Sequence, residues 1–100
     1  MAKQCETMAE VRTEIDRVDR LIVEILAERI QYIEQAARIK PERGQVRDEW
    51  RVNDVLEKTA KSAEEFGAPK ELIHMLYAEM IEWCINHEFK EFDRLEEGGA

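Results

Sequence analysis

Glycine, proline and cysteine are all scarce in this 100-residue sequence, which contains 4 Gly, 2 Pro and 2 Cys. Runs rich in β-branched and aromatic residues are also missing, so little in the chain favours strands. No apolar run approaches the roughly 18 to 20 residues that span a bilayer, and the N-terminal MAKQCETMAE lacks the apolar core of a signal peptide. We therefore expect a single all-α domain with a modest core, located in the cytoplasm.

The two cysteines are too few and too far apart to organise a fold. Cys5 and Cys84 have no metal-ligand spacing, and a single pair is not a disulfide framework. We expect two free thiols in a reducing compartment, and neither a metal ion nor a cofactor.

Positive charge is also in short supply. The chain has 15 Lys and Arg against 23 Asp and Glu, a formal net charge of −8. Nucleic acids and anionic membranes bind to basic surfaces, so neither is expected as a partner. An anionic ligand would have to be held by a few cations placed where they overcome the acidic background.

A long first helix is predicted by the spacing of apolar residues. Between Met8 and Lys40 there is neither Gly nor Pro, and apolar residues recur at alternating spacings of four and three. Pro41 disfavours helical geometry at the residue before it, so the helix should end near Lys40. The first part of this stripe, called the apolar seam below, consists of Val11, Ile15, Val18, Ile22 and Ile25.

Two further helices are expected. Asp48 can cap the second, which should stop at Gly67, and Pro69 suits the first turn of the third. The third helix should fade after Phe92. The segment PERGQVRDEW between the first two helices is well placed to form a lid. We divide the chain into a flexible N-terminus, a helical domain and a disordered tail, at residues 1–7, 8–95 and 96–100.

The first helix is too long for its own chain to cover. At 1.5 Å per residue it would measure about 45 to 50 Å, whereas a compact 100-residue domain has a radius of gyration of about 13 Å. Pairing with a second copy would bury the excess apolar seam. The fold class expected is therefore all-α, with three helices per chain in an intertwined homodimer.

Charged residues occupy positions that these helices would normally bury. Arg29 and Lys40 are 11 residues apart, roughly 20° in helical phase, and so look along one face of the first helix. Glu88 falls on the inward stripe of the third helix, and Arg51 lies at the edge of the apolar face of the second. Taken singly, each could be an internal ion-pair partner, a helix-end charge or a solvated surface residue.

Together these residues indicate an anionic ligand. Three cations beside one acid leave two positive charges uncompensated, which a small dicarboxylate would neutralise, because guanidinium groups bind carboxylates in bidentate fashion. Arg12 lies beside the apolar seam, about 25 Å from Arg29 along the same helix. It could reach the same ligand only across a dimer, although an exposed pair with Asp16 is an equally good interpretation.

The order and spacing of five charged positions resemble the AroQ-type, all-helical chorismate mutase family. They are Arg12 in VRTEID, Arg29 in LAER, Lys40 in ARIK, Arg51 after VRDEW and Glu88 in INHEF, and the likeness covers about residues 8 to 92. It implies an intertwined dimer of three-helix chains with two equivalent sites. It also implies a place in aromatic amino acid biosynthesis, where a Claisen rearrangement in the shikimate pathway converts chorismate to prephenate.

The resemblance assigns roles to individual residues. Arg29 and Arg51 would bind the substrate carboxylates from one chain, and Arg12 would be donated by the other. Lys40 would bind the substrate and its ether oxygen, with Glu88 as the second catalytic residue. Three further positions would line the substrate site: Asp48, Val52 and Cys84. Asp48 would lie near the substrate hydroxyl, although a role as the cap of the second helix explains the residue equally well.

Two positions depart from the commonest pattern of the family. Many bacterial members carry Gln where this chain has Glu88, and an ionised Glu has no proton to donate. Fungal members resemble this chain in having Glu there, so we expect Glu88 to work in its protonated form. Many mutases carry an acid where this chain has Val52.

The departure at Val52 keeps other functions open. The isochorismate pyruvate lyases of salicylate formation, a branch of the same fold, also have an apolar residue there, and QYIEQAARIK, AEEFGAP and IEWCI look similar to that branch. Glu88 stands where the lyases usually have Gln. Chorismate mutase is the preferred prediction and the lyase is the alternative, followed by amino-deoxychorismate mutation. A helical dimerisation module, in which the charged residues set the register between chains, is the non-enzymatic alternative.

Overall fold

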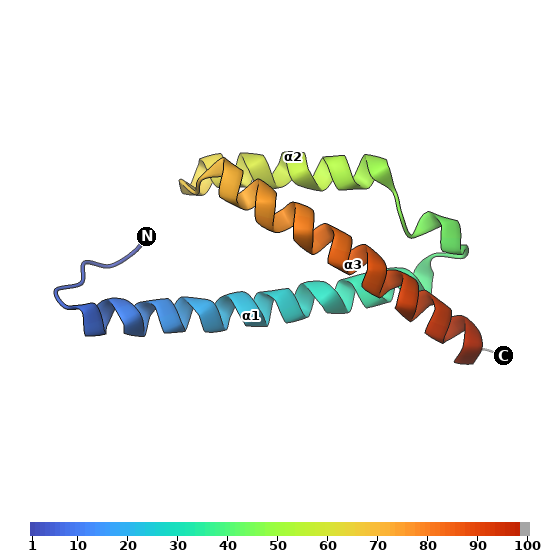
Figure 1. The fold of residues 1–100 in the computed structure, drawn as a ribbon, viewed down its shortest axis with the longest axis horizontal. Helices are drawn as coiled ribbons and strands as arrows, with labels where there is room; N and C mark the ends of the chain where they lie inside the picture. The colour runs from blue at the N-terminus through green and yellow to red at the C-terminus, as the bar shows by residue number, and fades with distance from the viewer. Residues whose placement is uncertain (99–100) are drawn as a thin grey trace. The chain divides into compact units, whose positions relative to one another are not determined.

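A computed structural model describes residues 1–98 and contains no strand within that range. Its elements, in chain order, are α1 (Met8–Ile39), the short 3₁₀ helix η1 (Arg43–Gln45), α2 (Glu49–Phe66) and α3 (Lys70–Gly98) (Figure 1). The all-α class, the three helices and the long first helix are thereby confirmed. No helix among the described residues is long and apolar enough to cross a membrane.

The ends of α1 follow from local chemistry. The Thr7 hydroxyl accepts a hydrogen bond from the Glu10 amide at 3.2 Å, as an N-cap does. At the other end the Lys40 amide still donates to the Ala36 carbonyl at 3.0 Å, and Pro41 then prevents continuation. The 32 residues correspond to about 48 Å of helix, as the sequence predicts.

The chain divides into two compact parts, residues 1–32 and the residues from 33 onward, with the boundary inside α1. In the first part, most of the apolar seam stays accessible: Ile15, Val18, Ile22 and Ile25 are 42 to 62% exposed. Monomeric proteins rarely leave an apolar surface of this length uncovered. That a single chain cannot cover its first helix stays a prediction, which this exposed surface supports.

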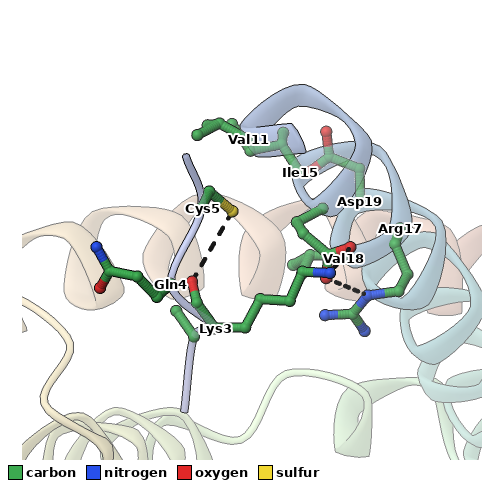
Figure 2. A pocket seen from close by; sticks show the side chains of 10 residues that line it. Lys3, Gln4, Cys5, Val11, Ile15, Arg17, Val18 and Asp19 are labelled. Atoms are coloured by element: carbon green, nitrogen blue, oxygen red, sulfur yellow. Dashed lines mark hydrogen bonds and ion pairs between the residues drawn. The ribbon is translucent and has the colours of Figure 1, made fainter. Parts of the chain in front are cut away.

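The N-terminal segment lies against the first turns of α1 and encloses a hollow of about 620 Å³ (Figure 2). Lys3 lies 3.7 Å from the Glu14 carboxylate, and the Cys5 thiol donates to the Lys3 carbonyl at 3.8 Å. The apolar wall of this hollow is the start of the seam, at Val11, Ile15 and Val18. None of the predicted site residues lines it.

α2 begins and ends at the residues predicted. Asp48 is its N-cap, and the Asp48 carboxylate accepts a hydrogen bond from the Arg51 amide at 3.2 Å. Gly67 is its C-cap in the left-handed region, at φ 73°. The Ala68 amide returns to the Ala63 carbonyl at 2.9 Å, which closes the helix end with a Schellman-type bond. α2 and α3 meet in a hairpin around this glycine (Figure 1).

α3 differs from the prediction at both ends. It begins at Lys70, so Pro69 precedes the first turn, and the Pro69 carbonyl accepts the first helical hydrogen bond, from Ile73. It continues to Gly98 and does not fade after Phe92. No Gly or Pro interrupts the chain before Gly98, and the Glu91–Arg94 pair one turn apart supports the extension. Residues 96–98 of the predicted tail are helical, and residues 99–100 lie outside the described residues.

The core lies in the second part of the chain. It joins the last turn of α1, the connecting segment, and one face of α3, with five buried apolar residues: Ala37, Val46, Ile81, Ile85 and Phe92. Residues of α2 pack against this cluster, among them Val52, Val55 and Leu56. This core is what fixes the C-terminal end of α1 against α3.

Gly67→Ala is expected to destabilise the protein by about 1 kcal/mol, because a Cβ at φ 73° is strained although no atom lies within 4 Å of it. Urea unfolding monitored by circular dichroism measures the change. Gly44→Ala is the matched control, since a Cβ there also meets nothing within 4 Å and no positive φ is required. Equal effects of the two substitutions would show that the backbone conformation at Gly67 is not the cause.

Candidate active site

A buried ion pair joins the two residues predicted to be catalytic. The Lys40 ammonium donates to Oε2 of Glu88 at 2.7 Å, from the residue that follows α1 to the middle of α3. Glu88 is only 4% exposed, and the Lys40 side chain is 29% exposed. Lys40 also donates to the Val46 carbonyl at 3.4 Å. The ammonium is therefore oriented by two acceptors while one side of it remains accessible.

Glu88 sits among apolar positions of α3. Ile85, one turn before it, and Phe92, one turn after it, are both buried at 7% exposure. Burying a carboxylate there costs free energy unless it is paired, because the apolar neighbours offer no hydrogen bonds in place of those it made with water. Lys40 supplies that pairing, and every buried polar side-chain atom in the described part of the chain has a partner.

A shallow cavity of about 580 Å³ opens beside Lys40. Asp48 lines it together with Lys40, so the structure brings these two predicted site residues to one hollow. Asp48 also caps α2, as described above, and its role at the substrate hydroxyl stays a prediction. The remaining lining residues come from the end of α1, the connecting segment and the first residue of α2: Ile39, Pro41, Gln45, Arg47 and Glu49.

Arg51 is paired within its own helix. Its guanidinium donates to the Asp54 carboxylate at 2.6 Å, and Lys58 donates to the same oxygen at 3.0 Å. These hydrogen bonds, that from Lys58 first, lower the pKa of Asp54 below its ordinary value. Arg51 is exposed, so this pairing is one that an incoming carboxylate could exchange.

The two uncharged site residues have different surroundings. Val52 is half-buried and packs against the core cluster. Cys84 is buried at 3% exposure and forms no disulfide bond. Both lie on helices of the second part of the chain, as does Glu88. Lys40 and Asp48 belong to the same part but lie in the segment between α1 and α2. Their contact with a substrate stays a prediction.

Arg12 and Arg29 belong to the first part of the chain. Arg29 is half-buried and Arg12 is exposed. Their roles in binding carboxylates, and the donation of Arg12 across a dimer, stay predictions.

Two features of the site were not predicted. One is the Val46 carbonyl, a backbone acceptor for Lys40 that no side-chain pattern could have indicated. The other is a second pair between α1 and α3, in which Nε2 of His87 lies 2.8 Å from the Glu34 carboxylate. The His87 ring also stacks on Trp83, with ring centroids 5.0 Å apart. An acid at 34 and a histidine at 87 carry no signal of pairing until the helices are placed together.

Comparison with known proteins gives the class to which this site belongs. The model of the family described as chorismate mutase type II matches residues 11–89. The chain therefore belongs to the chorismate mutase type II family, as its charged positions indicate. It is 33% identical over 88 residues to the isochorismate pyruvate lyase of Pseudomonas aeruginosa, a match that covers 88% of this chain and 87% of that protein. The family contains both isomerases that act on chorismate and this related lyase.

Lys40→Ala is expected to destabilise the protein by about 1 to 3 kcal/mol, because it leaves the Glu88 carboxylate buried without its cation. Urea unfolding at neutral pH is the measurement. Lys58→Ala, which removes a lysine from an exposed pair with Asp54, is the control and should cost far less. If both variants lose the same stability, the Lys40–Glu88 pair is no stronger than a surface ion pair.

Proposed function

We propose that this chain is a chorismate mutase, which converts chorismate to prephenate by an intramolecular Claisen rearrangement. The observation that carries the proposal is the Lys40–Glu88 pair, a cation held on a buried acid beside an open cavity, in a chain of the chorismate mutase type II family. In the reaction an ether C–O bond breaks while a C–C bond forms within one molecule. The catalyst therefore needs neither a nucleophile nor a general base.

Lys40 is suited to the electrostatic part of this reaction. Negative charge grows on the ether oxygen as the C–O bond breaks, and a preoriented ammonium stabilises that charge without reorganising. The Glu88 carboxyl and the Val46 carbonyl hold the ammonium in place. The rest of the acceleration comes from binding the reactive chair-like conformer of the substrate.

The substrate carboxylates require cations beyond Lys40. We assign this role to Arg29 and Arg51, with Arg12 of the partner subunit completing each site in a homodimer. The exposed apolar seam of α1 supports the dimer, because a second copy of the same helix would bury it. Asp48, Val52 and Cys84 complete the site, with Asp48 at the substrate hydroxyl.

Isochorismate pyruvate lyase is a second candidate. Two observations favour it: the identity to the Pseudomonas aeruginosa lyase extends over 88% of this chain, and Val52 is apolar where many mutases carry an acid. The same cationic site would bind isochorismate, which is also a dicarboxylate. The two candidates thus share their binding residues and differ in which isomer is converted.

Incubation of the purified protein with chorismate and, separately, with isochorismate distinguishes these candidates. A chorismate mutase consumes chorismate, seen as loss of its ultraviolet absorbance, and yields no salicylate fluorescence from isochorismate. The lyase yields that fluorescence. Lys40→Ala should lower the rate on the true substrate by at least about 100-fold, since it removes the cation at the ether oxygen, whereas Lys58→Ala should retain it. Turnover of neither isomer by the folded protein contradicts both candidates.

Glu88 can donate a hydrogen bond to the ether oxygen only through a carboxyl proton, whereas the amide of Gln always donates. We expect Glu88→Gln to retain or raise kcat and Glu88→Ala to lower it. Steady-state kinetics on the true substrate measures both. An equal loss in the two variants would show instead that Lys40 is the sole donor and that Glu88 only orients it.

A further inference from the structure

The segment that connects α1 to α2 is fixed to α3 on both sides of Val46. Val46 is 4% exposed and belongs to the core cluster, together with Ile81 and Ile85 of α3. Its amide donates to the Arg43 carbonyl at 3.1 Å, which closes η1. A buried side chain and a hydrogen-bonded amide leave the Val46 carbonyl little freedom. This is the carbonyl that accepts from Lys40.

Arg43 attaches the first half of the segment to α3. Its Nε and Nη2 donate to the two oxygens of Asp93 at 2.9 and 3.3 Å. The same guanidinium lies over the Phe89 ring, 4.5 Å from the ring centre. The carboxylate and the ring together fix the orientation of the planar guanidinium. The ammonium of a lysine is not planar and could not be oriented in this way.

Arg47 attaches the second half in the same way. Its two terminal nitrogens donate to the two oxygens of Glu82 at 3.1 and 2.6 Å, and one of them also donates to Glu49 at 3.2 Å. The hydrogen bonds from Arg47 lower the pKa of Glu82, and those from Arg43 lower the pKa of Asp93. Both acids are thus ionised partners at neutral pH.

The two acids stand on one face of α3. Glu82 and Asp93 are 11 residues apart, which is about 16 Å along the helix and roughly 20° in phase. The two arginines are four residues apart in the connecting segment, with Val46 between them in the sequence. They therefore bind α3 at two widely separated points. Exposed ion pairs of this kind add little to the free energy of unfolding, but bidentate pairs restrict geometry strongly.

We propose that Arg43 and Arg47 are positioning residues, which hold the Lys40 ammonium at its place in the site by fixing the Val46 carbonyl. They act on the reaction through Lys40. Arg47 also lines the cavity beside Lys40, but its guanidinium is held by Glu82 and Glu49. The catalytic part of this inference rests on the proposed function. The mechanical part, that the two arginines restrain Lys40, does not.

The double variant Arg43→Gln with Arg47→Gln tests the proposal, because glutamine keeps a polar side chain and removes both bidentate pairs. Arg94→Gln is the matched control: Arg94 also pairs through two nitrogens with an acid of α3, but that acid, Glu91, lies one turn before it on the same helix. The first measurement is the rate at which an amine-acetylating reagent modifies Lys40, followed by peptide mass spectrometry. The second is kcat and KM on whichever isomer the unmutated protein converts.

We expect Lys40 to be acetylated several-fold faster in the double variant, with kcat about tenfold lower and KM changed less, because a displaced cation stabilises the transition state poorly. The control should match the unmutated protein in both measurements. Exchanging the charges of one pair, with Arg47→Glu and Glu82→Arg together, should recover most of the kcat that Arg47→Glu alone loses. A merely stabilising role would lower the melting temperature without this change in kcat.

Each contrary result overturns either the mechanical or the catalytic part of the proposal. Unchanged Lys40 acetylation in the folded double variant, or an equal increase in the Arg94→Gln control, overturns the restraint of Lys40. Faster acetylation with unchanged kcat overturns the positioning role in an enzyme that is active. If the unmutated protein converts neither isomer, the proposed function fails and the acetylation rates still decide whether the two arginines restrain Lys40.

Discussion

The structure of the second part of the chain depends on the need to neutralise one buried carboxylate. Glu88 lies between buried residues of α3, where an unpaired charge would cost more than the small core around it could offset. Lys40 meets it because α1 ends at Ile39, and because the buried Ala37 is small enough to let the helix end approach α3. The contact between Lys40 and Glu88 thus depends on where α1 ends, on the small side chain of Ala37 and on the position of the connecting segment. A cation held in this way is also what a rearrangement with growing negative charge requires.

Much of the fold was predictable because its signals are local. The uninterrupted apolar spacing from Met8 to Lys40, the capping Asp48 and the left-handed Gly67 each act over a few residues, and each is observed at the predicted place. The apolar stripe of α3 predicts an end near Phe92, whereas the helix continues to Gly98. Ion pairs between charged side chains, such as that of Glu91 and Arg94, can extend a helix beyond the last residue that packs in the core.

The site was predictable only where side chains carried the signal. Inward positions of Lys40 and Glu88 on two separate helices indicated a charged cluster, and the structure brings them to 2.7 Å. The partners of Arg51 and the Val46 carbonyl depend on how the helices and the connecting segment pack, which spacing along the chain does not encode. The sequence left the choice between two isomeric substrates open, because the residue that bears on it, Val52, is apolar and carries no charge that would single out one isomer.

Loops between helices usually accept insertions and deletions, because their ends can be joined by many paths. The connection after α1 is different, since the ammonium of its first residue, Lys40, is hydrogen-bonded to the carbonyl of Val46, whose side chain is embedded in the core. Adding or removing one residue between them would change the ring closed by that hydrogen bond or pull Val46 from its place. In this molecule the length of the loop is therefore coupled to the position of the Lys40 ammonium, so an insertion in the segment 41–45 would disturb the end of α1 and the core at the same time.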